Sequence, residues 1–154
     1  MSQWFRVFGK STRPPEPAAL LQYFRQHDPD ATGKFHADAD GWFRAEFDPG
    51  RGPPALRVER YLANETGIRD ELNAWAAWVE AVDDDANHGA LMQHIISTAQ
   101  LFAIEDSADQ DTKTRTQELC VGLCRLLAVT TDGVCQADDL GFFAADGTLI
   151  VAES

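Results

Sequence analysis

Apolar and polar residues follow two periods along the first half of the chain, one typical of strands and one typical of helices. Residues 4–8 and 56–62 alternate in character, and this period of two predicts a strand in each. Residues 18–27 have helical spacing, and Pro17 suits the first turn of that helix because its missing N–H is not needed there. Residues 34–47 hold an Asp-Gly pair between two strand-like pieces, which predicts a hairpin.

The second half of the chain contains the most regular helical pattern. A helix capped by Asn64 is predicted from apolar residues spaced three or four apart, namely Ile68, Leu72, Trp75, Val79 and Val82. Residues 89–104 are ambiguous between helix and strand; we interpret 91–96 as a short helix and 99–104 as a strand, because the repeat needs a strand ahead of the next helix. A buried helix that ends at Asp132 and a hairpin that leads into a strand at 148–152 are expected to follow.

Two segments of the chain resemble each other. Residues 33–45 and 133–145 match without a gap at an offset of one hundred, and six positions are identical. This match predicts a strand-helix-strand-strand unit used twice, at about 4–63 and 99–152, with a helical insert at 64–98. The alternative is a chance similarity between two Asp-Gly turns that are flanked by aromatic residues.

The predicted order of elements defines the expected fold class. We expect one α+β domain over residues 1–154, in which the duplicated units form antiparallel sheet with helices packed on one face. Each unit alone would expose one side of its sheet and of its helix. Pairing the two units buries both, at roughly 25 cal/mol per Å² of apolar area.

Regular alternation within the matched strands sorts their side chains onto two faces. Phe43 and Phe143 are predicted to point to the core, whereas Trp42 and Phe142 point to the opposite face. The candidate surface for binding a ligand or partner therefore consists of Trp42, Arg44, Glu46, Arg57, Glu59 and Phe142. The alternative is that the helical insert covers this face with Trp75, because an isolated tryptophan on a sheet most often packs.

Charge narrows the classes of partner. The chain has a formal net charge of −12 and a pI near 4.5, so nucleic acid and anionic membrane surfaces are disfavoured as partners. A basic protein partner is compatible with this charge, as is simple solubility.

No apolar run of membrane-spanning length and no apolar leader is present, so we expect a cytoplasmic location. Arginine outnumbers lysine, and alanine and aspartate are abundant, which is typical of a GC-rich bacterial source.

Residues 36–41 invite comparison with a calcium-binding loop. The first and twelfth positions of such a loop would be His36 and Phe47, so the required oxygen ligands are missing. Asp38 and Asp138 are instead expected to bond their own backbone in turns, as aspartate does before glycine.

Other metal and catalytic patterns are weak. Asp83, Asp85 and His88 are candidate ligands for a divalent metal, although an acidic run in a loop is normally only solvated. Cys120 and Cys124 share a helix face, but zinc would need two further good ligands, so we expect small buried hydrophobic side chains. No nucleophile elbow, phosphate loop, dinucleotide fingerprint or metalloprotease helix is present, so we predict no cofactor and no catalytic residue.

Two resemblances to known proteins add expectations. Residues 132–143, together with Asp146 and Gly147, resemble the C-terminal end of a group of uncharacterised bacterial proteins and carry no catalytic motif. The predicted strand-helix-strand-strand duplication is similar to the GyrI-like proteins. That resemblance implies a small molecule bound between the two halves and an acidic residue in the central cavity, a place that Glu46 or Glu59 would take here.

These observations favour a non-enzymatic bacterial cytoplasmic protein that binds either a protein partner or a small ligand. The duplicated unit, the acidic surface and the missing catalytic motifs motivate this hypothesis. The alternative is a small hydrolase-type or metal-dependent enzyme that uses aspartate and histidine residues within 36–40 or 83–88. The oligomeric state stays open.

Overall fold

The computed structural model describes residues 3–48, 56–82, 88–106 and 113–153, and these form eight strands and four helices. Their order along the chain is β1 (Gln3–Gly9), α1 (Pro17–His27), β2 (Thr32–Asp38), β3 (Gly41–Asp48), β4 (Leu56–Leu62), α2 (Ile68–Ala81), α3 (His88–Ile96), β5 (Gln100–Asp106), α4 (Lys113–Thr131), β6 (Gly133–Ala137), β7 (Gly141–Phe143) and β8 (Leu149–Ala152). The strand predicted at 99–104 is thus confirmed as β5.

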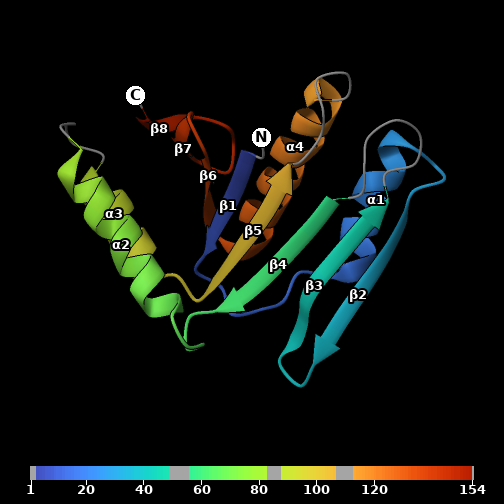
Figure 1. The fold of residues 1–154 in the computed structure, drawn as a ribbon, viewed down its shortest axis with the longest axis horizontal. Helices are drawn as coiled ribbons and strands as arrows, with labels where there is room; N and C mark the ends of the chain where they lie inside the picture. The colour runs from blue at the N-terminus through green and yellow to red at the C-terminus, as the bar shows by residue number, and fades with distance from the viewer. Residues whose placement is uncertain (1–2, 49–55, 83–87, 107–112, 154) are drawn as a thin grey trace.

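All eight strands belong to one antiparallel sheet with the order β2-β3-β4-β5-β1-β6-β7-β8 (Figure 1). The prediction of an α+β fold with an antiparallel sheet is confirmed. In Figure 1, α1 and α4 lie behind the sheet, α2 and α3 lie at its other side, and no helix covers β3, β4 and β5 on the side nearest the viewer. This uncovered part of the sheet contains the candidate site.

The larger hydrophobic core lies between the sheet and the helices α1 and α4. Phe24 of α1 stacks on Phe47 of β3, with ring centroids 4.4 Å apart. The long helix α4 adds Leu123 and Leu127 to this core, and β5 adds Phe102 from the opposite side. All of these side chains are fully buried, so this layer holds the two helices on one face of the sheet.

A second core lies on the other face, beneath α2 and α3. Phe142 of β7 is at its centre, and its ring lies within 5.8 Å of the rings of Phe8, Trp75 and Trp78. Leu72 of α2 is fully buried in the same cluster. At β7 the structure therefore shows the predicted alternative, in which the helix that carries Trp75 covers this face of the sheet.

The start of α2 differs from the sequence-based prediction. Its N-cap is Gly67, whose φ of 86° lies in the left-handed region that glycine adopts most easily, and not Asn64. A turn in which the Ile68 N–H donates to the Glu65 carbonyl at 3.1 Å leads into the helix. This extra turn separates Asn64 from the first free N–H groups of α2, so its side chain caps nothing there.

The two matched segments form hairpins at different places in the sheet. Residues 33–45 cover β2 and β3, and β2 is an edge strand, whereas residues 133–145 cover β6 and β7, and β6 pairs with the central strand β1. The duplication itself stays a prediction. Within the described ranges, no helix combines the length and apolar character that crossing a membrane requires.

Candidate functional site

A β-bulge in β3 changes which side chains face the candidate site. His36 pairs with Arg44 and Ala37 pairs with Trp42, so Phe43 is an extra residue without a partner in β2. The bulge interrupts the regular alternation. As a result Trp42 points into the core, and Phe43 is 39% exposed, which is the reverse of the prediction for both residues.

Neither of the two aromatic residues proposed for the binding surface is exposed. Trp42 is 3% exposed, its ring lies 5.9 Å from that of Phe102, and its Nε1 donates to the Pro15 carbonyl at 2.9 Å. Phe142 is 0% exposed and is covered by Trp75. The two belong to different cores on opposite faces of the sheet, so they do not form one surface.

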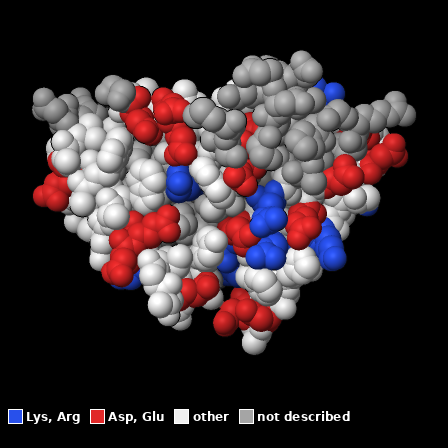
Figure 2. Space-filling view, viewed as in Figure 1, with Lys and Arg blue, Asp and Glu red and all other residues white. Residues whose placement is uncertain are grey.

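The four charged residues of the prediction do share a face with one another. Arg44, Glu59, Ala103 and Arg6 lie side by side across β3, β4, β5 and β1, and so do Glu46, Arg57, Glu105 and Trp4. With Phe43 and Tyr61, these residues form the part of the sheet, on the side of α2 and α3, that the helices leave uncovered; we call it the open face. In Figure 2, Lys and Arg side chains are interleaved with Asp and Glu side chains at the middle of this side.

Ion pairs form both between and within strands of the open face. The Arg44 Nε of β3 lies 3.1 Å from the Glu59 Oε1 of β4, and the Arg57 Nη1, also of β4, lies 3.7 Å from the same oxygen. His36 and Glu46 are 3.3 Å apart at the outer strands. Opposite charges on neighbouring strands stabilise the register modestly, because each exposed pair contributes about 0.2–1 kcal/mol.

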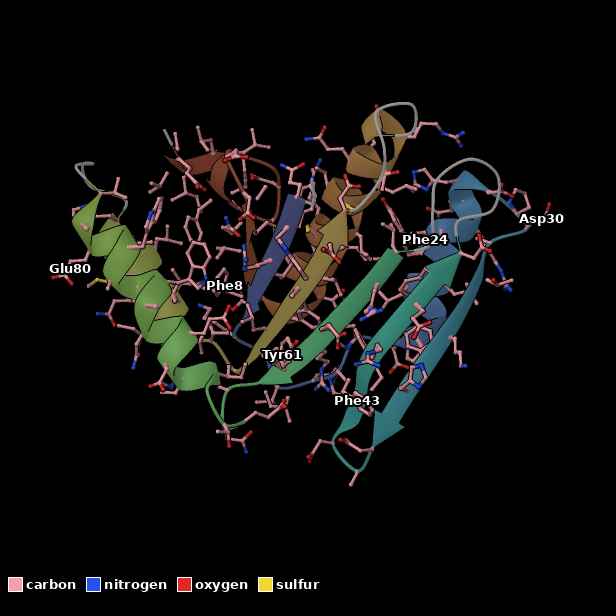
Figure 3. All side chains as sticks on the ribbon, viewed as in Figure 1. Phe8, Phe24, Asp30, Phe43, Tyr61 and Glu80 are labelled. Carbon is pink, nitrogen blue, oxygen red and sulfur yellow. The ribbon has the colours of Figure 1, made fainter. Side chains whose placement is uncertain are left out.

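Tyr61 lies between two shallow depressions of the open face, and Figure 3 places its side chain near the middle of the view. The first depression, of about 470 Å³, is lined by Asp38, Asp40, Phe43, Arg44, Glu59, Arg60, Tyr61, Leu62, Asn64 and Glu65. The second, of about 410 Å³, reaches the start of α2 and is lined by Trp4, Arg6, Tyr61, Thr66, Gly67, Ile68, Glu71 and Ala103.

Carboxylates dominate the electrostatics around Tyr61. Its pKa is raised first by burial and then by the negative charges of Glu59, Glu71 and Glu65, with Arg44 acting in the opposite direction. An ionised phenol would add another negative charge to this cluster. Tyr61 is therefore a neutral, half-buried ring within a negative local potential, an arrangement that favours a cation near the ring.

The guanidinium groups beside these carboxylates already have partners. Arg60 donates to the Gln100 Oε1 at 2.7 Å and to the Trp42 carbonyl at 2.8 Å, and burial lowers its pKa. Arg44 is paired with Glu59. Arg60 nevertheless stays close enough to Asp38, Asp40 and Glu65 for their charges to act on it, so it offsets part of the negative charge of the first depression.

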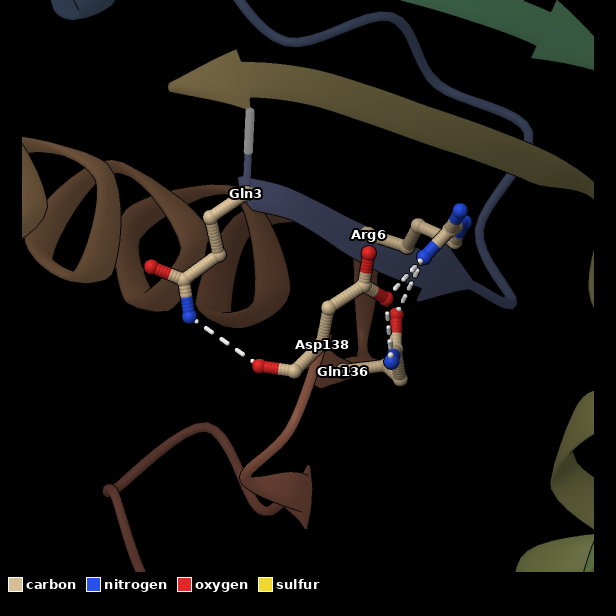
Figure 4. Close-up of polar contacts among 4 residues, drawn as sticks. All are labelled: Gln3, Arg6, Gln136 and Asp138. Atoms are coloured by element: carbon tan, nitrogen blue, oxygen red, sulfur yellow. Dashed lines mark hydrogen bonds and ion pairs between the residues drawn. The ribbon is translucent and has the colours of Figure 1, made fainter. Parts of the chain in front are cut away.

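The third guanidinium belongs to a separate polar cluster (Figure 4). The Arg6 Nη1 donates to the Gln136 Oε1 and to the Asp138 Oδ1, each at 2.8 Å, and Gln136 donates to the same carboxylate at 3.1 Å. The Arg6 guanidinium also lies 5.0 Å from the ring centroid of Trp75. Gln3 bonds the Asp138 carbonyl at 3.0 Å. This cluster joins β1 to β6 and supports α2 from below.

The two matched aspartates have different roles. Asp38 accepts the Asp40 N–H at 2.8 Å, so it bonds its own turn as predicted. The Asp138 carboxylate instead binds Arg6 and Gln136, because β6 lies beside β1, where those side chains are within reach. The prediction of a turn bond at Asp138 was therefore wrong.

The candidate metal ligands from the sequence lie only partly within the described residues. Among the described residues, no group of three or more His, Cys, Asp or Glu side chains could hold a metal ion. Asp83 and Asp85 lie outside the described residues, and His88 is the first residue of α3. The three cysteines are free and buried, as expected for small hydrophobic side chains.

Tyr61, Trp4 and Arg6 are site residues that sequence reasoning missed. Tyr61 follows Glu59 by two positions in a strand, so alternation alone places it on the same face. Trp4 and Arg6 required the pairing of β1 with β5, which links distant parts of the chain. Comparison of this chain with protein-family models, with curated proteins and with solved structures gives no match, so a functional inference depends on its own residues.

Proposed function

We propose that this protein binds a partner protein that presents a basic side chain, and that the open face around Tyr61 receives it. The observation that carries the proposal is that the carboxylates of Glu65 and Glu71 lie near a half-buried tyrosine ring, beside Glu59, whose own charge is already paired with arginine. A lysine or arginine placed there would gain both charge attraction and contact with the ring face.

The shape of the open face favours a protein over a small molecule. Small-molecule sites enclose most of the ligand surface, whereas both depressions beside Tyr61 are shallow and lie next to each other. The face spans four neighbouring strands, or roughly 14 Å at about 4.8 Å per strand, before the helix α2 is added. A surface of this extent suits contact with a strand, helix or loop of another protein.

Charge supports the same class of partner. The net charge of −12 gives a basic partner a favourable long-range attraction, which raises the rate of association. The alternating charges of Glu46, Arg57 and Glu105 at the edge of the face would restrict the orientation of that partner rather than supply most of the affinity.

The finer expectations from the sequence belong to this proposal. A bacterial, cytoplasmic and non-enzymatic protein remains our hypothesis, as does an origin of its two halves by duplication. The order strand, helix and three strands in each half supports the duplication. The GyrI-like resemblance implies an acidic residue in a central cavity, a place that Glu46 or Glu59 would take.

A peptide titration tests the proposal. We expect a short peptide of alternating arginine and glycine to shift the backbone amide resonances of β4 and of the start of α2 in heteronuclear NMR spectra, while an equivalent glutamate peptide does not. The double variant Glu65→Gln/Glu71→Gln should bind the arginine peptide about tenfold more weakly, since each lost charge costs up to about 1 kcal/mol.

A charge-matched control separates this site from general acidity. Asp30→Asn/Glu80→Gln removes the same number of charges at positions that Figure 3 places far from Tyr61, and it should change the affinity less than about twofold. Equal losses in both double variants, or amide shifts spread evenly over the surface, would show that the peptide binds through net charge and would overturn the proposal.

A further inference from the structure

A pocket of about 310 Å³ lies on the opposite side of the sheet from Tyr61, between α4 and the strands β6 and β7. Its walls are almost entirely apolar. They are formed by Phe5, Val121, Cys124, Arg125, Cys135, Gln136, Ala137, Leu140, Phe143, Ala144 and Gly147. Close-packed interiors leave few voids larger than a water molecule, so a space of this size beside the core requires a reason.

Small residues next to large ones create this space. The small residues Ala137, Ala144 and Gly147 line it together with the large rings of Phe5 and Phe143. An apolar cavity of about 150 Å³ is enough to hold a benzene-sized molecule, and this pocket is roughly twice as large. Its volume lies at the lower end of the range for small-molecule sites, which is about 300–1,000 Å³.

Two thiol groups form part of the pocket floor. The neighbouring Cys135 side chain and burial raise the pKa of the Cys124 thiol well above its ordinary value. Both cysteines are free and buried, so they act as polarisable, apolar contacts. Sulfur atoms of this kind pack favourably against aromatic rings.

The mouth of the pocket carries one cation. Arg125 is exposed on α4, and its guanidinium is held in place by the carbonyls of Ala145, at 3.4 Å, and Asp146, at 2.9 Å. In the part of the chain that the structure describes, no carboxylate lies within ion-pair distance of Arg125. A fixed guanidinium at the rim of an apolar pocket complements a ligand with one apolar and one anionic end.

We infer that this pocket is a binding site for a small aromatic carboxylic acid. The ring would fill the space between Phe5, Phe143 and the two cysteines, and the carboxylate would lie at the mouth against Arg125. Exposed Val121 and Leu140 extend the apolar rim around the entrance. The sheet separates this pocket from the open face, so the proposals for this site and for the partner site can be tested independently.

A pair of isosteric probes tests both ends of the ligand. We expect 4-isopropylbenzoate to bind the full chain at pH 7 about tenfold more tightly than 4-isopropylbenzamide, measured by titration calorimetry, because only the acid pairs with Arg125. Arg125→Gln should abolish the preference for the acid. Arg115→Gln removes an exposed arginine of the same helix that does not line the pocket, and it should preserve the preference.

Two further variants test the location. Ala144→Leu fills the pocket from its rim and should remove binding of both probes. Val121→Asp places a carboxylate at an exposed position of the mouth, where the fold tolerates it, and should weaken the acid more than the amide. Circular dichroism and a thermal melt establish that each variant is folded.

Three results would overturn the inference. Failure of the wild-type chain to bind either probe would exclude an aromatic ligand in this pocket. Equal affinity of acid and amide would exclude the role of Arg125. If Ala144→Leu and Val121→Asp are both folded and bind the acid as wild type does, the ligand occupies another place.

Discussion

Replacing Phe142 with alanine tests which side chains of the two matched hairpins belong to the core. Phe142 is 0% exposed, and its ring contacts those of Phe8, Trp75 and Trp78 at centroid distances of 5.7–5.8 Å. Removing a buried phenylalanine costs about 3–5 kcal/mol, and the lost aromatic pairs place this variant toward the upper end of that range. The matched variant Phe43→Ala truncates a ring that is 39% exposed, so it should cost about 1 kcal/mol or less.

Urea unfolding followed by far-UV circular dichroism measures both losses without depending on the tryptophan environment. With a slope of about 2 kcal/mol per molar urea, the midpoint should fall by about 2 M for Phe142→Ala and by less than about 0.5 M for Phe43→Ala. Because the larger loss is a sizeable part of the 5–15 kcal/mol typical of domains, the milder Phe142→Leu provides a second measurement. Equal losses at the two positions would refute the assignment of Phe142 to the core and of Phe43 to the surface.

Three further outcomes follow from individual contacts. Burial lowers the pKa of His94, so the unfolded chain binds its proton more tightly and stability should fall as the pH drops below about 6.5. His94→Gln should flatten this dependence in urea unfolding at pH 7 and 5. Gly9→Ala should lower the thermal midpoint, at a cost of about 1–3 kcal/mol, because its Cβ would lie 2.5 Å from the Thr131 Oγ1. Gly89→Ala in α3 has open space around its Cβ and should raise stability by about 0.5–1 kcal/mol in the same melts.

The elements could be predicted from the sequence because their patterns are local. The helix at Pro17–His27 and the strand at Leu56–Leu62 have the predicted bounds, since a helix-starting proline and the alternation from Leu56 to Glu59 need no distant partner. The short strand Gln100–Asp106 could also be placed, although its burial on both faces hides the alternation.

The faces of β3 could not be predicted because they depend on the bulge at Phe43. Alternation assumes one residue per pleat, and an unpaired residue reverses the side on which every preceding side chain lies. The structure shows what makes the reversal favourable: Trp42 gains an apolar environment beside Phe102 and a hydrogen bond to the Pro15 carbonyl. Both partners are distant in sequence, so no local pattern around Trp42 indicates them.

The residues of the candidate site also differ in whether the sequence alone could place them. Arg44, Glu46, Arg57 and Glu59 were placed together correctly, since strands β3 and β4 are neighbours along the chain and their alternation is visible beyond the bulge. The positions of the Glu65 and Glu71 carboxylates near Tyr61 depend on the direction in which the chain leaves the sheet at Gly67 to begin α2. A left-handed turn at one glycine therefore decides the charge around the ring, and spacing alone does not reveal it.

The strand order also limits what the matched hairpins can have in common. After α1 the chain enters the sheet at its edge and moves inward from β2 to β4, whereas after α4 it enters beside β1 and moves outward from β6 to β8. A twofold axis that exchanges β1 and β5 would exchange β4 with β6, and not β2 with β6. The identical letters at positions such as Asp38 and Asp138 are therefore placed in different surroundings, a free turn in one and an arginine-binding carboxylate in the other. A turn needs the first carboxylate and the contact between β1 and β6 needs the second, so identical residues at matched positions of the two hairpins make different contacts.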